Sequence, residues 1–154
     1  MKLIERDTIH VCGWAVETTA ENNDRDISAL YDDFFSTGKE ALLRGLDGSQ
    51  PGYFGLSWYA AGHDRYSYLL GVQVGQNSQP PAGAVMKTLE TTQWAVAEYP
   101  AEKDIMEAWN EFFYTDIPQA GYAPNDEYNL YFEYYPADVH GDYQLWVPVL
   151  AAAA

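Results

Sequence analysis

Basic residues are scarce in this chain of 154 residues. Only 8 lysines and arginines stand against 23 aspartates and glutamates, which gives a formal net charge of −15. Proteins that bind nucleic acid neutralise phosphates with clustered Lys and Arg, and binding to an anionic membrane surface depends on the same charges. The composition therefore excludes direct binding to nucleic acid or to a membrane surface.

Cysteine and long apolar runs are also nearly absent. The single cysteine, Cys12, cannot form an internal disulfide, and no run of about 18 apolar residues predicts a membrane span. The N-terminal residues 1–7 are charged where a signal peptide is apolar. We therefore expect a cytoplasmic protein that does not enter a membrane.

The usual metal and cofactor motifs are missing as well. The three histidines, His10, His63 and His140, do not have the spacing of metal ligands with one another or with Cys12. The chain also has no Gly-rich loop between a strand and a helix of the kind that binds phosphate. The sequence thus predicts neither a metal nor a cofactor.

Aromatic residues, in contrast, are abundant. The chain has 13 Tyr, 5 Trp and 6 Phe, which together make 16% of its residues. With 47% apolar and 20% charged residues it has the composition of a folded protein, and its length fits one domain over residues 1–154. So many amphipathic rings indicate an aromatic cavity or interface in addition to a core.

Two segments 78 residues apart share a pattern. Residues 26–37 and 104–115 have Asp, Ile, two Phe and Thr at the same places, and such self-similarity at a fixed offset indicates an internal repeat. The same offset places Tyr53 on Tyr131. With small slips in the offset, further matches are Trp14 with Trp94 and residues 66–72 with residues 143–149. The sequence therefore predicts two pseudo-repeats, at about 8–75 and 84–149.

Each repeat reads as strand, helix, strand, strand. Alternating and helical spacing of apolar residues predicts strands at 8–18, 53–60, 66–75, 84–90, 92–99, 128–135 and 143–149, and helices at 26–44 and 102–116. Asp26 is the expected N-cap of the first helix, and Gly45 is expected to close it. Short connections, such as the loop 61–65, require antiparallel pairing. We predict an α+β fold, with helices on one face of a mostly antiparallel sheet and a concave ligand cleft where the halves meet.

Glu133 is the residue that fits a core least well. Period-two alternation places it on the same strand face as Tyr131 and Tyr135, and its repeat counterpart is Gly55, so the strand itself does not require an acid. A buried carboxylate without a partner is costly or takes up a proton, and a lipophilic cation among aromatic rings would be such a partner. Alternatively, this face is exposed to solvent and Glu133 is one more surface acid.

The order and spacing of several motifs resemble the GyrI-like small-molecule-binding proteins. This domain is shared with the effector-binding modules of AraC- and MerR-type transcription activators, and the resemblance is strongest to the free-standing, integron-cassette branch. Members of the family consist of two strand-helix-strand-strand repeats. The motifs that carry the resemblance are residues 26–34, 68–74, 94–96, 132–135 and 145–149.

The resemblance implies a set of ligand-binding residues. Glu133 matches the acid at the centre of the family's drug pocket, Tyr135 and Trp146 match two lining positions, and Trp109 matches an aromatic residue from the second helix. Without the resemblance, helical spacing would place Trp109 in the core. We complete the candidate site with Tyr131 and with Tyr53, its counterpart in the first repeat.

The leading functional hypothesis is a protein that binds amphipathic, cationic aromatic compounds, as a sensor or a sequestering module. A second hypothesis is a hydrolase of electrophilic toxins, an activity found among GyrI-like proteins, with Glu133 as general base and Tyr135 as orienting group. A third is an acidic mimic of nucleic acid. Because the chain has no room for the helix-turn-helix of its larger relatives, control of transcription would need a regulator as a partner.

Overall fold

The computed structural model describes residues 1–59 and 64–153. Its strands are β1 (Lys2–Arg6), β2 (Ile9–Thr19), β3 (Tyr53–Tyr59), β4 (Arg65–Val74), β5 (Val85–Leu89), β6 (Thr92–Tyr99), β7 (Tyr122–Pro124), β8 (Tyr131–Tyr135) and β9 (Tyr143–Ala151). Its helices are α1 (Asn23–Ser36), α2 (Lys39–Arg44), α3 (Ile105–Glu111), the π-helical segment η1 (Phe112–Asp116) and α4 (Ile117–Gln119). In the part of the chain so described, no helix is long and apolar enough to cross a membrane.

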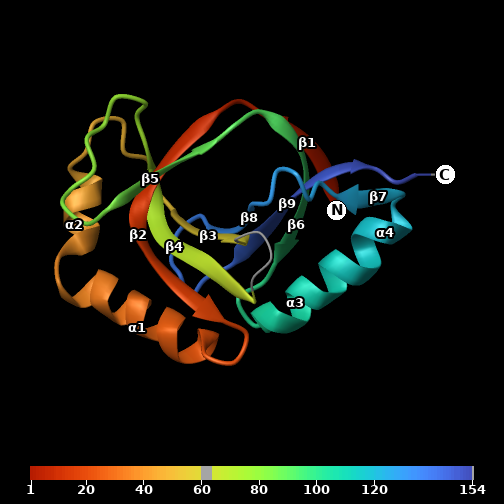
Figure 1. Cartoon of the computed structure of the whole chain (residues 1–154), viewed down its shortest axis with the longest axis horizontal. Coiled ribbons are helices and arrows are strands. Elements are labelled where there is room, and N and C mark those ends of the chain that lie inside the picture. Colours follow the sequence, from red (N-terminus) through yellow and green to blue (C-terminus); the bar gives the residue numbers. More distant parts are fainter. Residues whose placement is uncertain (60–63, 154) are drawn as a thin grey trace.

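The main strands form one strongly curled antiparallel sheet, in the order β1-β6-β9-β8-β3-β4-β2-β5, and β7 pairs with β9 outside this path. Figure 1 shows α1 and α2 on one side of the curl and α3 and α4 on the other, all outside it. The predicted α+β fold with a mostly antiparallel sheet is confirmed.

The strand order is symmetric about the centre of the sheet, which agrees with two repeats. β3 and β8 lie side by side in the middle, followed outward by β4 and β9, then by β2 and β6. The outermost strands are exchanged between the halves. β1 precedes β2 in the chain but pairs with β6, and β5 precedes β6 but pairs with β2.

The pairing register corrects two of the predicted matches between the repeats. Leu70 lies opposite Gly55 and Leu145 lies opposite Glu133, the equivalent residues of the two central strands, so Leu70 and Leu145 are themselves equivalent. The predicted match of 66–72 with 143–149 instead pairs Leu70 with Val147 and is therefore wrong. Trp14 faces Leu70 and Ala97 faces Leu145. The counterpart of Trp14 is therefore Ala97 and not Trp94. Both matches were wrong because, in a chain so rich in aromatic residues, several different sequence offsets place one aromatic residue on another.

The helices differ from their predicted bounds for local reasons. The helix expected over 26–44 breaks at Gly38, whose φ of 81° is left-handed. Asp26 is not the N-cap, because α1 begins three residues earlier and the Asp26 carboxylate accepts a hydrogen bond from Thr18 at 2.8 Å. Its counterpart Asp104 does cap α3 and accepts from the Glu107 amide at 3.1 Å. Gly45 follows the last residue of α2, as expected.

Two short strands were not predicted. β1 lies in the charged N-terminal segment, and β7 lies in a loop rich in turn residues. Most of the predicted hairpin loop 61–65 falls outside the described residues.

The core has two layers, one on each face of the sheet. The inner face carries an aromatic cluster that includes Phe54, Trp94, Phe132 and Trp146. On the outer face, one cluster packs under α1 and another under α3. Each is anchored by a fully buried phenylalanine at the same repeat position, Phe34 and Phe112, as the repeat predicted. Glu133 lies on the outer face, at the seam between these two clusters.

Candidate functional site

The two central strands bring Glu133 to the middle of the sheet. In the antiparallel pair of β3 and β8, Gly55 lies directly opposite Glu133. These two residues are also equivalent in the 78-residue repeat. Equivalent positions of two antiparallel strands face each other only where the twofold axis crosses the pair, so Glu133 lies on the pseudo-twofold axis of the molecule.

The Glu133 carboxylate is buried, with 7% of the residue exposed. The Tyr68 hydroxyl, from β4, donates a hydrogen bond to Oε1. The indole Nε1 of Trp109, from α3, donates to Oε2 at 3.3 Å. Burial raises the pKa of Glu133, and the hydrogen bonds from Tyr68 and Trp109 oppose that rise only in part.

A third ring extends this network into the first half of the molecule. The hydroxyls of Tyr31, from α1, and Tyr68 lie 2.6 Å apart. Since the one O–H of Tyr68 is donated to Glu133, Tyr31 is the donor in this bond. One helix from each half is therefore connected to the same carboxylate, α1 through Tyr31 and Tyr68, and α3 directly through Trp109.

Gly55 provides the space that this arrangement needs. A Cβ atom at position 55 would lie 2.7 Å from Glu133 Oε1 and would overlap the Tyr68 hydroxyl. The glycine is thus required by close packing, because any side chain at position 55 would displace the groups that hold the carboxylate.

The tyrosines around Glu133 are held in their neutral form. Burial, together with the negative charge of Glu133, raises the pKa of Tyr31, Tyr68 and Tyr135. Neutral phenols remain hydrogen-bond donors and present ring faces with negative electrostatic potential. The site therefore combines one ionisable acid with several uncharged aromatic groups.

Four of the predicted site residues share the Glu133 face of the sheet or approach it from a helix. Tyr135 and Tyr131 flank Glu133 along β8, and Tyr53 pairs with Tyr135 across the strands. Trp109 reaches the carboxylate itself. The Tyr53 hydroxyl donates to Glu40 and not to Glu133.

Trp146 is not brought to this group. It lies directly opposite Phe132 and stacks on its ring at 5.2 Å and 13°. Strand alternation places Phe132 and Glu133 on opposite faces, so Trp146 belongs to the inner core. Its indole Nε1 donates to Gln144 at 3.0 Å.

Tyr31 and Tyr68 are site residues that the sequence did not reveal. They lie within the motifs 26–34 and 68–74, and nothing in those motifs distinguishes them as members of the hydrogen-bond network around Glu133. Their one available signal is the hydroxyl group, because a buried tyrosine usually needs a hydrogen-bond partner. The partner itself could not be found without the strand register.

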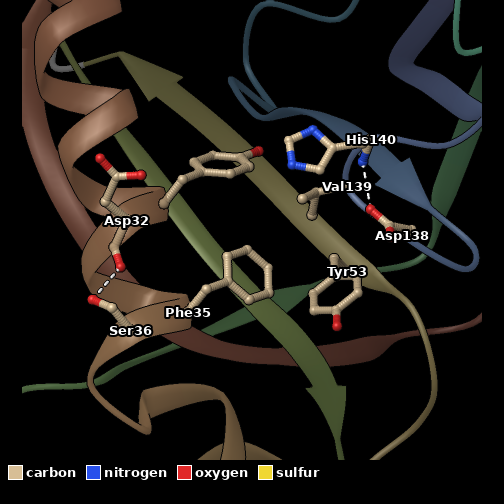
Figure 2. A pocket seen from close by; sticks show the side chains of 8 residues that line it. Asp32, Phe35, Ser36, Tyr53, Asp138, Val139 and His140 are labelled. Atoms are coloured by element: carbon tan, nitrogen blue, oxygen red, sulfur yellow. Dashed lines mark hydrogen bonds between the residues drawn. The ribbon is translucent and has the colours of Figure 1, made fainter.

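A cavity of about 570 Å³ opens beside this network, between α1 and the segment that joins β8 to β9. Figure 2 shows Phe35, from α1, facing Tyr53, and places Val139 and His140 on the same side of the cavity as Tyr53. Glu133 does not line the cavity, but Tyr31 does, and Tyr31 is one hydrogen bond away from the ring that donates to Glu133. Among the described residues, no group of His, Cys, Asp and Glu is arranged to hold a metal ion.

A mostly antiparallel sheet built from two related halves is the architecture that the sequence resemblance to the GyrI-like domains implied. The model of the Cass2 family, integron-associated effector binding proteins, matches residues 2–149. The chain belongs to this family, which confirms the resemblance noted in its sequence. No curated protein matches the chain.

Three solved structures show the same fold. SAV2435 bound to tetraphenylphosphonium is 17% identical, with a TM-score of 0.78 over 97% of this chain and 93% of that one. The integron cassette protein VCH_CASS2 from the mobile metagenome of Vibrio cholerae is 16% identical, with a TM-score of 0.69 over 97% and 95%. A putative transcription regulation protein from Staphylococcus aureus MU50 is 16% identical, with a TM-score of 0.68 over 96% and 96%. At these identities the likeness establishes the fold alone.

Proposed function

We propose that the protein binds amphipathic aromatic cations at the Glu133 site, as a sensor or a sequestering module. The observation that carries this proposal is the environment of the carboxylate. Its hydrogen-bond donors are the neutral groups of Tyr68 and Trp109, and none of the salt bridges found within residues 1–59 and 64–153 involves Glu133. A buried acid without a cationic side chain is available to pair with a cationic ligand.

The surrounding rings add to the attraction for such a ligand. A cation over an aromatic face gains roughly 0.5–2 kcal/mol, and aromatic rings of Tyr31, Tyr68, Trp109 and Tyr135 lie around the carboxylate. The net charge of −15 would raise the local concentration of any cation without selecting one. Selectivity would come from the rings and from Glu133.

The two donors of Glu133 differ in how readily a ligand could replace them. Tyr68 is buried, and its hydroxyl is fixed by Tyr31 as well as by the carboxylate. Trp109 is partly exposed and makes the longer bond of 3.3 Å. We therefore propose that a cation reaches the carboxylate by displacing the Trp109 indole, which exchanges one neutral hydrogen bond for an ion pair.

The comparisons support a small-molecule ligand. The matched family is one of effector-binding proteins, and SAV2435, which shares the fold, was solved with a lipophilic cation. A relative described as a transcription regulation protein is consistent with a regulator as partner, and we include that partner in the proposal.

The proposal is tested with a cation and its neutral isostere, benzyltrimethylammonium and neopentylbenzene, together with tetraphenylphosphonium. Calorimetry or tryptophan fluorescence should show that benzyltrimethylammonium binds more tightly than neopentylbenzene. Glu133→Gln should weaken binding of both cations by about tenfold or more, equivalent to 1.4 kcal/mol. Glu127→Gln, at an exposed position, is the control and should leave binding unchanged. Equal affinities for the cation and its isostere would overturn the proposal.

Hydrolysis of an electrophilic ligand is the second candidate function. The observation that favours it is a buried carboxyl with a raised pKa beside the phenol of Tyr135, since a general base works best when its pKa approaches neutrality. Mass spectrometry of the ligand after incubation separates the two functions. A new product that requires Glu133 would indicate turnover, and an unchanged ligand would indicate binding alone.

A further inference from the structure

Aromatic side chains continue past Glu133 on both sides of the pseudo-twofold axis. The 78-residue repeat relates Phe35 to Phe113 and Tyr53 to Tyr131. In each half the phenylalanine comes from the helix and the tyrosine from a central strand, and their rings meet edge to face. The ring centroids are 5.5 Å apart for Phe35 and Tyr53, and 5.7 Å apart for Phe113 and Tyr131.

The first aromatic group, Phe35 with Tyr53, borders the cavity beside α1. Both residues line it, together with Tyr31. Phe35 is 43% exposed, which is unusual for a phenylalanine on a helix that packs on a sheet. This group can therefore take an apolar ring from solution without any change in the core.

The second aromatic group, Phe113 with Tyr131, lies on the side of α3. Tyr114 extends it, with its ring 5.2 Å from that of Phe113 and 73% of the residue exposed. Phe113 and Tyr114 belong to the π-helical segment η1. π-Helical turns are rare and occur frequently at functional sites. The exposed aromatic rings and the π-helical segment η1 thus coincide, and both indicate a ligand-binding position.

Glu133 lies midway between the two groups. Tyr131 is two residues from Glu133 along β8, and Tyr53 pairs with Tyr135, which is two residues away in the other direction. At roughly 3.4 Å per residue, each tyrosine position is displaced by about 7 Å along the strands from the position of Glu133. That distance suits a ligand in which one atom separates a central charge from each ring.

We propose that the site selects cations that carry two aromatic arms, one on each side of the charge. This inference rests on the proposed function and names the ligand class of the same site. One arm stacks on Phe35 and Tyr53, the other on Phe113 and Tyr131, and the charge lies at Glu133. The near symmetry of the protein about Glu133 matches the symmetry of such a ligand.

The test compares three ammonium ions by calorimetry. Benzyltrimethylammonium has one aromatic arm, dibenzyldimethylammonium has two, and benzylheptyldimethylammonium replaces the second ring with an alkyl chain of equal carbon number. Burying a second ring should make the two-armed ion bind about tenfold or more tightly than the one-armed ion. It should also bind more tightly than the heptyl analogue, because stacking requires a ring.

Two variants locate the arms. Phe35→Leu and Phe113→Leu should each remove most of the advantage of the two-armed ion. Each should weaken binding of benzyltrimethylammonium by only about twofold, because its single ring loses one of two equivalent groups and can still use the other. Leu42→Ala, which changes an apolar residue on α2 that is 54% exposed, is the control and should retain the full advantage. If Phe113→Leu does not fold, the exposed Tyr114→Ser should reduce the same advantage.

The outcomes separate this inference from the proposed function. Equal affinities for the one-armed and two-armed ions, or an advantage that survives both Phe113→Leu and Tyr114→Ser, would overturn the two-arm inference alone. If benzyltrimethylammonium does not bind, or if its binding does not depend on Glu133, then the proposed function fails and this inference fails with it.

Discussion

Gly55 and Glu133 occupy equivalent positions of the two repeats and face each other across the central strand pair. Only one of the two positions can carry a side chain, because a Cβ atom at Gly55 would collide with the Glu133 carboxylate and the Tyr68 hydroxyl. The pseudo-twofold symmetry of the fold is therefore broken at its axis. One buried acid is present where two would repel each other.

Gly55→Ala should lower the free energy of unfolding by roughly 1–3 kcal/mol, because the added methyl group overpacks the site. It should also weaken cation binding, since the carboxylate must move. Gly45→Ala is a matched control, because a Cβ there meets its nearest atom at 3.6 Å. Urea unfolding compares the two variants. A Gly55→Ala protein as stable as the control would show that the carboxylate is not held against position 55.

The pH dependence of stability should report on Glu133. Burial raises its pKa above the ordinary value of 4.5 in the folded protein, so the folded state holds the proton more tightly than the unfolded state. The corresponding stabilisation is complete below pH 4.5 and is lost as the pH rises through the raised pKa. The unfolding free energy of the parent, relative to Glu133→Gln, should therefore fall as the pH rises above 4.5. Unfolding curves across this range check the slope, and a flat difference would contradict the burial of the ionisable group.

Tyr68→Phe should destabilise the protein more than Tyr31→Phe. Removing the Tyr68 hydroxyl leaves the Oε1 atom of Glu133 and the Tyr31 hydroxyl without their partner, at a cost of roughly 1–3 kcal/mol. Removing the Tyr31 hydroxyl keeps the bond from Tyr68 to Glu133 and should cost only about 0.5–1.5 kcal/mol. Chemical unfolding of both variants gives the comparison. Equal losses would mean that the hydroxyls do not form a chain that ends at the carboxylate.

Phe34→Ala and Phe112→Ala should each cost roughly 3–5 kcal/mol, because each leaves a cavity in a fully buried cluster under its helix. For a protein whose total stability is about 5–15 kcal/mol, either loss is severe. Phe35→Ala, at the neighbouring exposed position, is the control and should be far better tolerated. Thermal melts measure all three variants, and a large loss at only one of the two buried positions would contradict their equivalence.

Much of the fold could be predicted because it depends on local patterns. Alternating residues predicted β2, β4, β6 and β9 nearly in place, and the paired phenylalanines predicted the buried side of both helices. β1 was not predicted because three of its five residues, Lys2, Glu5 and Arg6, are charged. A half-exposed edge strand tolerates such residues, but they give no recognisable strand pattern. The break at Gly38 was missed because glycine also occurs within helices.

Residue patterns alone could predict the candidate site only where one strand was enough, and Trp109 was predicted through the family resemblance. Glu133, Tyr131 and Tyr135 share a face by simple alternation, and the structure agrees. Tyr68 could not be identified, because its contact with Glu133 depends on the register of β4 against β3 and of β3 against β8. For the same reason the sequence could not show that Trp146 faces the opposite side. Side chains 65 residues apart meet through pairings that no local pattern contains.

The exchange of β1 and β5 between the halves bears on how the chain folds. Neither half can complete its own part of the sheet, since β6 takes its outer neighbour from the N-terminus and β2 takes its outer neighbour from the start of the second half. Contacts between segments so far apart in sequence close only after long loops have been ordered, which slows folding. A fragment cut in the linker at 76–83 would carry two unpaired strand edges. The two halves are thus mutually dependent, like the subunits of a strand-swapped dimer joined into one chain.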